Sequence, residues 1–116
     1  MKKSDLTWAA GLLEGEGCFY TQHARRYPAV KCNMTDRDVV VRLYRLFGVG
    51  HLQYIHTPFM RARGWKVQWS WQVQAQADAR RVMRLVLPYM GKRRTAKIKE
   101  LLARQPARRT GMKEAA

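Results

Sequence analysis

The feature that most constrains the fold is an alternating run, KVQWSWQVQA, between Lys66 and Ala75. Because successive side chains of a strand point to opposite faces, this run predicts a strand with one polar face and one apolar face. The polar face carries Lys66, Gln68, Ser70, Gln72 and Gln74, and the apolar face carries Val67, Trp69, Trp71, Val73 and Ala75. We therefore expect a sheet that packs under helices on one face and leaves the other face open.

The segment before this strand predicts a helix followed by two strands. Ser4 and the residues DLTWAAGLLEG predict a helix of about ten residues with Ser4 as the N-cap, ended by Gly15 and Gly17. The strand-like residues from Cys18 to Met34 are interrupted by a basic turn near positions 25–28, so we expect two strands there.

Capping signals and apolar periodicity predict the remaining elements. Thr35 and Asp38 have the spacing of a capping box for a second helix, and Gly48-Val49-Gly50 ends it. A second strand pair, a third helix and a fourth helix follow, at about His51–His56 with Lys66–Ala75, Asp78–Leu87, and from Lys92. The order predicts one α+β domain over residues 1–104, with an antiparallel sheet covered by helices on one face.

The net charge of the chain indicates which class of partner it binds. Lysine and arginine number 23 against 8 acidic residues, which gives a formal charge of +15 in 116 residues. A field of this sign attracts polyanions, so nucleic acid is the first candidate partner and an anionic membrane the second. No apolar run approaches the ~18 residues of a membrane span and no secretion signal is visible, so we expect an intracellular protein without membrane contact. Residues 105–116 predict a basic, flexible tail.

The chemistry of the polar face favours contact with DNA. It contains glutamines and no carboxylate, and glutamine pairs with adenine while arginine or lysine pairs with guanine in the major groove. The same alternation in the first strand pair adds three residues, and the start of the third strand adds two. The expected DNA-contacting set outside the Lys66–Gln74 run is Tyr20, Gln22, Arg26, His51 and Gln53.

Two of the few acidic residues, Glu14 and Glu16, lie together at the expected C-terminus of the first helix. The helix dipole disfavours negative charge there, so their position calls for a cationic partner. A divalent cation is one such partner, because hard cations prefer oxygen ligands. Ion pairs with nearby arginines are the alternative.

Gly11 and Gly15 lie four residues apart, on one face of the same helix. Small residues at this spacing let another backbone approach closely. The approaching backbone is either the sheet of the same chain or the same helix of a second subunit. A contact between two copies of the helix brings two copies of the acidic pair together.

These residues resemble a known family. Residues 9–17, AAGLLEGEG, resemble the motif that gives the LAGLIDADG homing endonucleases their name, and Trp8 and Cys18-Phe19 extend the match. Residues 48–50 and 88–94 are similar to segments that the family carries after its second and third helices. The resemblance covers roughly residues 4–104. The sequence departs from the motif at Ala9 and Leu13, which are packing positions, and has glutamate in place of aspartate at position 16.

The resemblance implies the LAGLIDADG homing-endonuclease fold, α-β-β-α-β-β-α, with a saddle-shaped antiparallel sheet along the major groove. A chain with a single motif then forms a homodimer, with Gly11, Gly15 and Trp8 at the interface. The implied activity is metal-dependent cleavage of a long, roughly palindromic double-stranded DNA target. The implied site residues are Glu16 as ligand of Mg²⁺ or Mn²⁺, Lys92 as the basic catalytic residue (or Arg93 if the match is shifted by one residue), and Asn33 or Thr35 as the residue that orients water.

Two other functions remain open at this point. The first is a non-cleaving relative on the same fold, such as a regulator or a maturase that binds intron RNA. The second is a small basic ribosome-associated protein or RNA chaperone, which has no use for the acidic pair or for the two spaced glycines.

Overall fold

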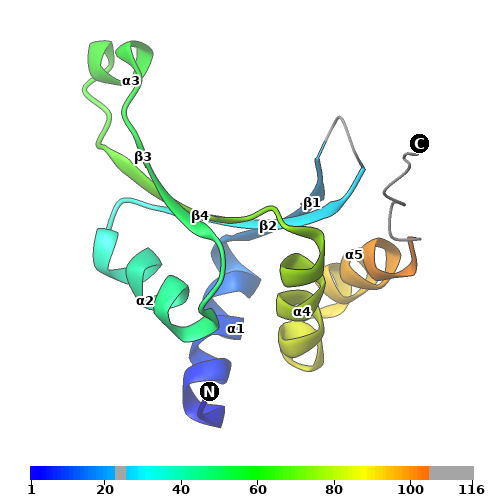
Figure 1. Ribbon diagram of the computed structural model, residues 1–116. Coiled ribbons are helices and arrows are strands. Elements are labelled where there is room, and N and C mark those ends of the chain that lie inside the picture. Colours follow the sequence, from blue (N-terminus) through cyan, green and yellow to red (C-terminus); the bar gives the residue numbers. More distant parts are fainter. Residues whose placement is uncertain (23–25, 105–116) are drawn as a thin grey trace.

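An antiparallel sheet of four strands, with helices α1, α2 and α4 on one of its sides, forms the body of the protein (Figure 1). The computed structural model describes residues 1–22 and 26–104, so the expected C-terminal tail lies outside the described residues. The strands are β1 (Gly17–Thr21), β2 (Pro28–Met34), β3 (His51–Ile55) and β4 (Gln68–Val73), in the order β1-β2-β4-β3. The helices are α1 (Lys3–Glu16), α2 (Arg37–Phe47), α3 (Pro58–Ala62), α4 (Gln76–Val86), the 3-10 turn η1 (Leu87–Tyr89) and α5 (Lys92–Ala103).

The apolar face of β4 is the centre of the core, as its alternation predicted. Trp71 is fully buried, stacks on Phe47 with ring centroids 5.5 Å apart, and donates a hydrogen bond from Nε1 to the Val49 carbonyl at 3.0 Å. Val73 is also fully buried. Ala75, predicted on the same face, is instead exposed, because the strand has ended and this residue is the N-cap of α4.

Helix α1 is longer than the sequence signals indicated. Its N-cap is Lys2, so the prediction of Ser4 as N-cap is wrong, and Gly15 lies inside the helix and does not end it. Glycine lowers helix stability by about 1 kcal/mol relative to alanine but does not by itself stop a helix. The stop is Gly17, which turns into β1; a Cβ atom there would lie 2.7 Å from the Leu13 carbonyl oxygen.

Helix α2 begins one residue later than predicted. Asp36 is its N-cap and forms no side-chain cap hydrogen bond, so the predicted capping box between Thr35 and Asp38 is wrong. Its end was predicted correctly. Gly48 adopts the left-handed conformation (φ 68°) that glycine tolerates, and its amide bonds to the Tyr44 carbonyl.

A short helix, α3, occupies the connection between β3 and β4, where no helix was predicted from the sequence. Thr57 is its N-cap, with Oγ1 accepting a hydrogen bond from the Met60 amide at 3.2 Å, and Pro58 is its first residue. Both are ordinary helix-start signals. Among the residues described, none of these helices has the length and apolar character needed to cross a membrane.

Candidate functional site

The strand register defines one open surface, which we call the polar face. Gln72 pairs with Lys31 and His51, and Ser70 pairs with Asn33 and Gln53, so these side chains share one side of the sheet. The polar face comprises Cys18, Tyr20, Lys31, Asn33, His51, Gln53, Gln68, Ser70 and Gln72. It lies opposite the side covered by α1, α2 and α4 (Figure 1). Cys18 and Lys31 were missed from the sequence, although the alternation of β2 around Val30 and Cys32 was a usable signal.

Hydrogen bonds link the amides of the polar face into a network. Gln72 donates from Nε2 to Gln53 Oε1 and to Ser70 Oγ, both at 3.1 Å, and its own Oε1 accepts from Gln74 Nε2 at 3.2 Å. Ser70 then donates to Asn33 Oδ1 at 2.5 Å. Ser70 is fully buried, so it orients Asn33 and Gln72 from below and is not itself open to a ligand. The network holds several amides in place before any partner binds.

The remaining predicted contact residues extend around this network. Gln22 donates to the Gln74 backbone carbonyl at 2.7 Å, which joins the end of β1 to the end of β4. The Lys31 ammonium lies 5.1 Å from the centre of the Tyr20 ring, and partial burial raises the pKa of the Tyr20 hydroxyl. Lys66 and Arg26 are exposed outside the strands, and Arg26 has a positive φ of 56°.

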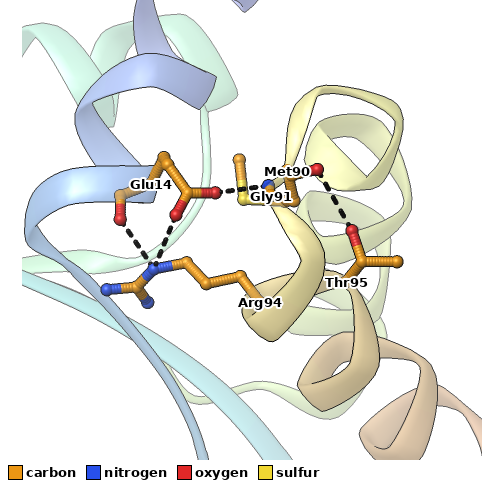
Figure 2. A network of polar contacts seen from close by, with 5 residues as sticks. All are labelled: Glu14, Met90, Gly91, Arg94 and Thr95. Carbon is orange, nitrogen blue, oxygen red and sulfur yellow. Dashed lines mark hydrogen bonds and ion pairs between the residues drawn. The ribbon is translucent and has the colours of Figure 1, made fainter.

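Glu14 is held by the start of α5 (Figure 2). Its Oε1 accepts a hydrogen bond from the Gly91 amide at 2.6 Å, and its Oε2 lies 3.6 Å from Arg94 Nε. Arg94 Nε also donates to the Glu14 backbone carbonyl at 2.7 Å. The carboxylate therefore caps α5 and pairs with an arginine, so ion pairing with arginine, which the sequence left open, applies to this acid.

Glu16 has a different environment. It is the last residue of α1 and is exposed, and within residues 1–22 and 26–104 no hydrogen bond or ion pair engages its carboxylate. Its charge affects the nearby Cys32 thiol. Burial is the main cause that raises the pKa of this thiol to about 11, and the negative charge of Glu16 is the second cause. Glu16 is therefore a free carboxylate at the unfavourable end of a helix dipole, close to the edge of the polar face.

A single chain offers a divalent cation only part of a coordination shell. The described residues contain no cluster of three or more histidine, cysteine, aspartate or glutamate side chains that could hold a metal ion. Glu14 is occupied by Gly91 and Arg94, which leaves Glu16 as the available carboxylate at this end of α1. This donor set fits Mg²⁺, which often binds one or two carboxylates and completes its shell with phosphate oxygens and water.

The basic residues at the start of α5 differ in position. Arg93 lines a cavity of about 480 Å³ together with Gly17, Cys18 and Lys97, directly beside the end of α1. Lys92 is exposed and is not among the lining residues, and Arg94 is paired with Glu14. Arg93, the second of the two candidates, therefore lies beside Gly17 and Cys18, the two residues that follow Glu16.

The two candidates for orienting water are also separated. Asn33 lies on the polar face, exposed, with its Oδ1 fixed by Ser70. Thr35 lies beyond the end of β2, in the bend before α2, and is not part of the hydrogen-bond network of the polar face.

The predicted interface on α1 is open in the isolated chain. Gly11 and Gly15 are exposed, and a Cβ atom added to either would meet no atom of residues 1–22 or 26–104 within 4 Å. The sheet of the same chain therefore does not require these glycines, which removes one of the two explanations the sequence allowed. Trp8 is half-buried, with the Arg42 guanidinium 3.8 Å from its ring centre.

Comparison with known proteins rests on structure. No family model and no curated protein matches the sequence. The homing endonuclease I-CvuI, in complex with the I-CreI target and Mg with the DNA not cleaved, matches with a TM-score of 0.67 and 16% identity, over 86% of this chain and 64% of that one. I-TnaI matches at 0.61 and 18% over 83% and 67%, and archaeal intron-encoded I-Vdi141I, complexed with DNA, at 0.64 and 12% over 86% and 67%.

This chain thus spans about two thirds of the length of those endonucleases. The match includes the antiparallel sheet and the helices that cover it. The chain adopts the fold of the LAGLIDADG homing endonucleases.

Proposed function

We propose that this chain is a single-motif LAGLIDADG homing endonuclease that cleaves double-stranded DNA as a homodimer with a divalent cation. The observation that carries the proposal is the Glu16 carboxylate, which no hydrogen bond or ion pair engages among the described residues, beside a polar face that bears no acidic side chain. Glu14, two residues earlier on the same helix, is by contrast paired with Arg94. The structural likeness to homing endonucleases bound to DNA supports the same function.

The polar face serves as the DNA-binding surface. Gln72 is hydrogen-bonded to Gln53 and to Ser70, so little side-chain entropy is lost when these two glutamines contact base edges. Lys31 and the other basic residues supply phosphate contacts, which position the duplex without selecting sequence. The formal charge of +15 strengthens the encounter with DNA.

The cleavage site is assigned to the end of α1. Glu16 holds the cation, Arg93 stabilises negative charge that develops on the phosphate, and Asn33 orients the attacking water. A bound divalent cation supplies charge neutralisation at the phosphate and lowers the pKa of the attacking water. Each subunit provides one such carboxylate, so two subunits provide one for each strand of the duplex.

The dimer interface is assigned to the face of α1 that carries Trp8, Gly11 and Gly15. Two exposed glycines cost the helix about 1 kcal/mol each, and the chain's own packing does not require them. Close approach of the same helix from a second subunit accounts for them.

The test is cleavage of a supercoiled plasmid that carries the intron-lacking form of the host locus, or a site selected from random DNA by binding. We expect linear product with Mg²⁺ or Mn²⁺ and none with EDTA. Specific binding without nicking or linearisation in either metal would identify the protein as a non-cleaving relative.

A further inference from the structure

The α3 tip, which we define as Phe59, Arg61, Arg63, Trp65 and Lys66, carries an unusual surface. Phe59 and Trp65 are 55% and 54% exposed, although large aromatic side chains are normally covered. The tip stands at the end of the β3–β4 pair and rises on the side of the sheet opposite α1, α2 and α4 (Figure 1). Lys66 belongs to the DNA-contacting run expected from the sequence, whereas the other four residues have no role assigned so far.

The exposed rings are held in a defined arrangement. Phe59 and Trp65 meet edge to face with centroids 5.6 Å apart, and the Arg63 guanidinium lies 3.4 Å from the Phe59 ring centre. Below them, Arg61 Nη1 donates to the His56 carbonyl at 3.0 Å, and His56 Nε2 lies 3.3 Å from the Trp65 carbonyl oxygen. The α3 tip is therefore a preorganised surface of planar groups.

The charge of the α3 tip indicates a polyanionic partner. No acidic residue occurs between Asp38 and Asp78, and no ion pair engages Arg61, Arg63 or Lys66 among the residues the structure describes. Arginine and exposed aromatic rings also occur in protein interfaces. Three unpaired cations beside the DNA-binding side of the sheet favour nucleic acid over a protein partner.

We propose that the α3 tip binds the duplex outside the segment covered by the polar face, and so lengthens the DNA footprint. Arg61, Arg63 and Lys66 contact phosphates, while Phe59 and Trp65 pack against the sugar–phosphate wall and hold the Arg63 guanidinium in place. This inference rests on the proposed DNA binding, but not on cleavage.

The experiment measures wild-type affinity for duplexes centred on the selected site, with flanks lengthened stepwise. Wild type should gain affinity once the flank reaches the α3 tip. The double variant Phe59→Ala/Arg63→Ala should lose that gain, by roughly tenfold, and should match wild type on the shortest duplex. Arg63→Lys, which keeps the charge but not the planar group, should lose part of the gain. Tyr44→Ala, which removes an aromatic ring that is 40% exposed on α2, is the matched control and should behave as wild type.

An equal gain with flank length in wild type and the double variant would overturn the proposal. The proposal would also be overturned if the double variant lost affinity only for single-stranded oligonucleotides and not for the duplexes. That result would identify the α3 tip as a surface that stacks unpaired bases. Cleavage of the shortest duplex separates this proposal from the proposed function. If wild type binds but never cuts, the proposed nuclease activity fails, while the dependence on flank length still decides the role of the α3 tip.

Discussion

Two neighbouring regions at the end of α1 each contain a glutamate, and the two carboxylates have opposite environments. At the junction with α5, Glu14 is bonded to the Gly91 amide and paired with Arg94 (Figure 2). At the junction with β1, two residues later, Glu16 is exposed and no hydrogen bond or ion pair engages it in the described part of the chain. The first carboxylate has its partners within one chain, and the second is open to solvent and to a ligand. The proposed function assigns that open position to a cation on DNA.

The comparison separates stability from function. The contacts of Glu14 join residues 77 positions apart in the sequence, so they fix α5 against α1 and bring Arg93 beside Gly17 and Cys18. Substitutions at Glu14 should therefore lower the free energy of unfolding. Substitutions at Glu16 should lower cleavage without lowering the free energy of unfolding.

The largest expected effect is on cleavage by Glu16→Gln. The change keeps the shape of the side chain but removes the charge that binds the cation, so cleavage should fall by several orders of magnitude (about 10²–10⁴). The free energy of unfolding should stay the same or rise slightly, because the helix dipole no longer opposes a negative charge. Plasmid nicking and linearisation, with DNA affinity measured in parallel, check the effect on cleavage, and urea denaturation checks the free energy of unfolding. Undiminished cutting by this variant would remove Glu16 from the site.

The next effect concerns assembly. Gly11→Leu should abolish dimerisation and double-strand cleavage, because the new side chain separates the two α1 helices. The isolated chain should fold normally, since a Cβ atom at this position meets no neighbour. Sedimentation at micromolar concentration measures the change, and Gly11→Ala is the milder control. A variant that stays dimeric would place the interface elsewhere.

A smaller effect is expected on the polar face. Gln72→Ala should weaken specific binding by about 1–3 kcal/mol and relax sequence preference at one base position in each half-site. The loss also frees Gln53 and Ser70, which Gln72 bridges. Substitution of Arg108 and Arg109 serves as the control, because it should weaken all DNA alike and reduce the salt dependence. Identical binding profiles over a randomised site for wild type and Gln72→Ala would contradict the role of this face.

The smallest effect should come from Glu14→Gln. The amide can still accept from Gly91 but no longer pairs with Arg94, and the Glu14 side chain is 40% exposed, so the free energy of unfolding should fall by about 1 kcal/mol. Cleavage should remain close to wild type at temperatures where the variant is folded. Urea denaturation measures the change, and a larger loss of cleavage than of stability would contradict the division between the two acids.

The sequence predicted the sheet more accurately than the helix ends. Alternation around Trp71 identified β4 and both of its faces, because a strand's period is set by its own backbone. Helix starts depend on which of several polar residues caps the first turn, and Ser4 and Thr35 were plausible caps that the structure does not use. Helix α3 was missed even though Thr57 and Pro58 signal a helix start, because a five-residue helix is too short to show periodicity.

The candidate site was only partly predictable for a related reason. The acidic pair Glu14 and Glu16 and the polar residue Gln72 stand out by type and position along the chain, whereas Asn33 and Thr35 were alternatives that only the resemblance supplied. The pairing of Glu14 with Arg94, and the placement of Arg93 in preference to Lys92, depend on how α5 packs against α1 and β1. No local sequence pattern predicts this packing between segments that are far apart in the chain.

The most direct test of the central claim is the binding of Mn²⁺ to the protein–DNA complex, measured by the loss of the free-ion paramagnetic signal. Wild type and Glu14→Gln should retain Mn²⁺ with similar affinity, whereas Glu16→Gln should bind it much more weakly while still binding DNA. If Glu16→Gln retains Mn²⁺ as wild type does, or if Glu14→Gln is the variant that loses it, the assignment of the open carboxylate as the metal ligand is contradicted.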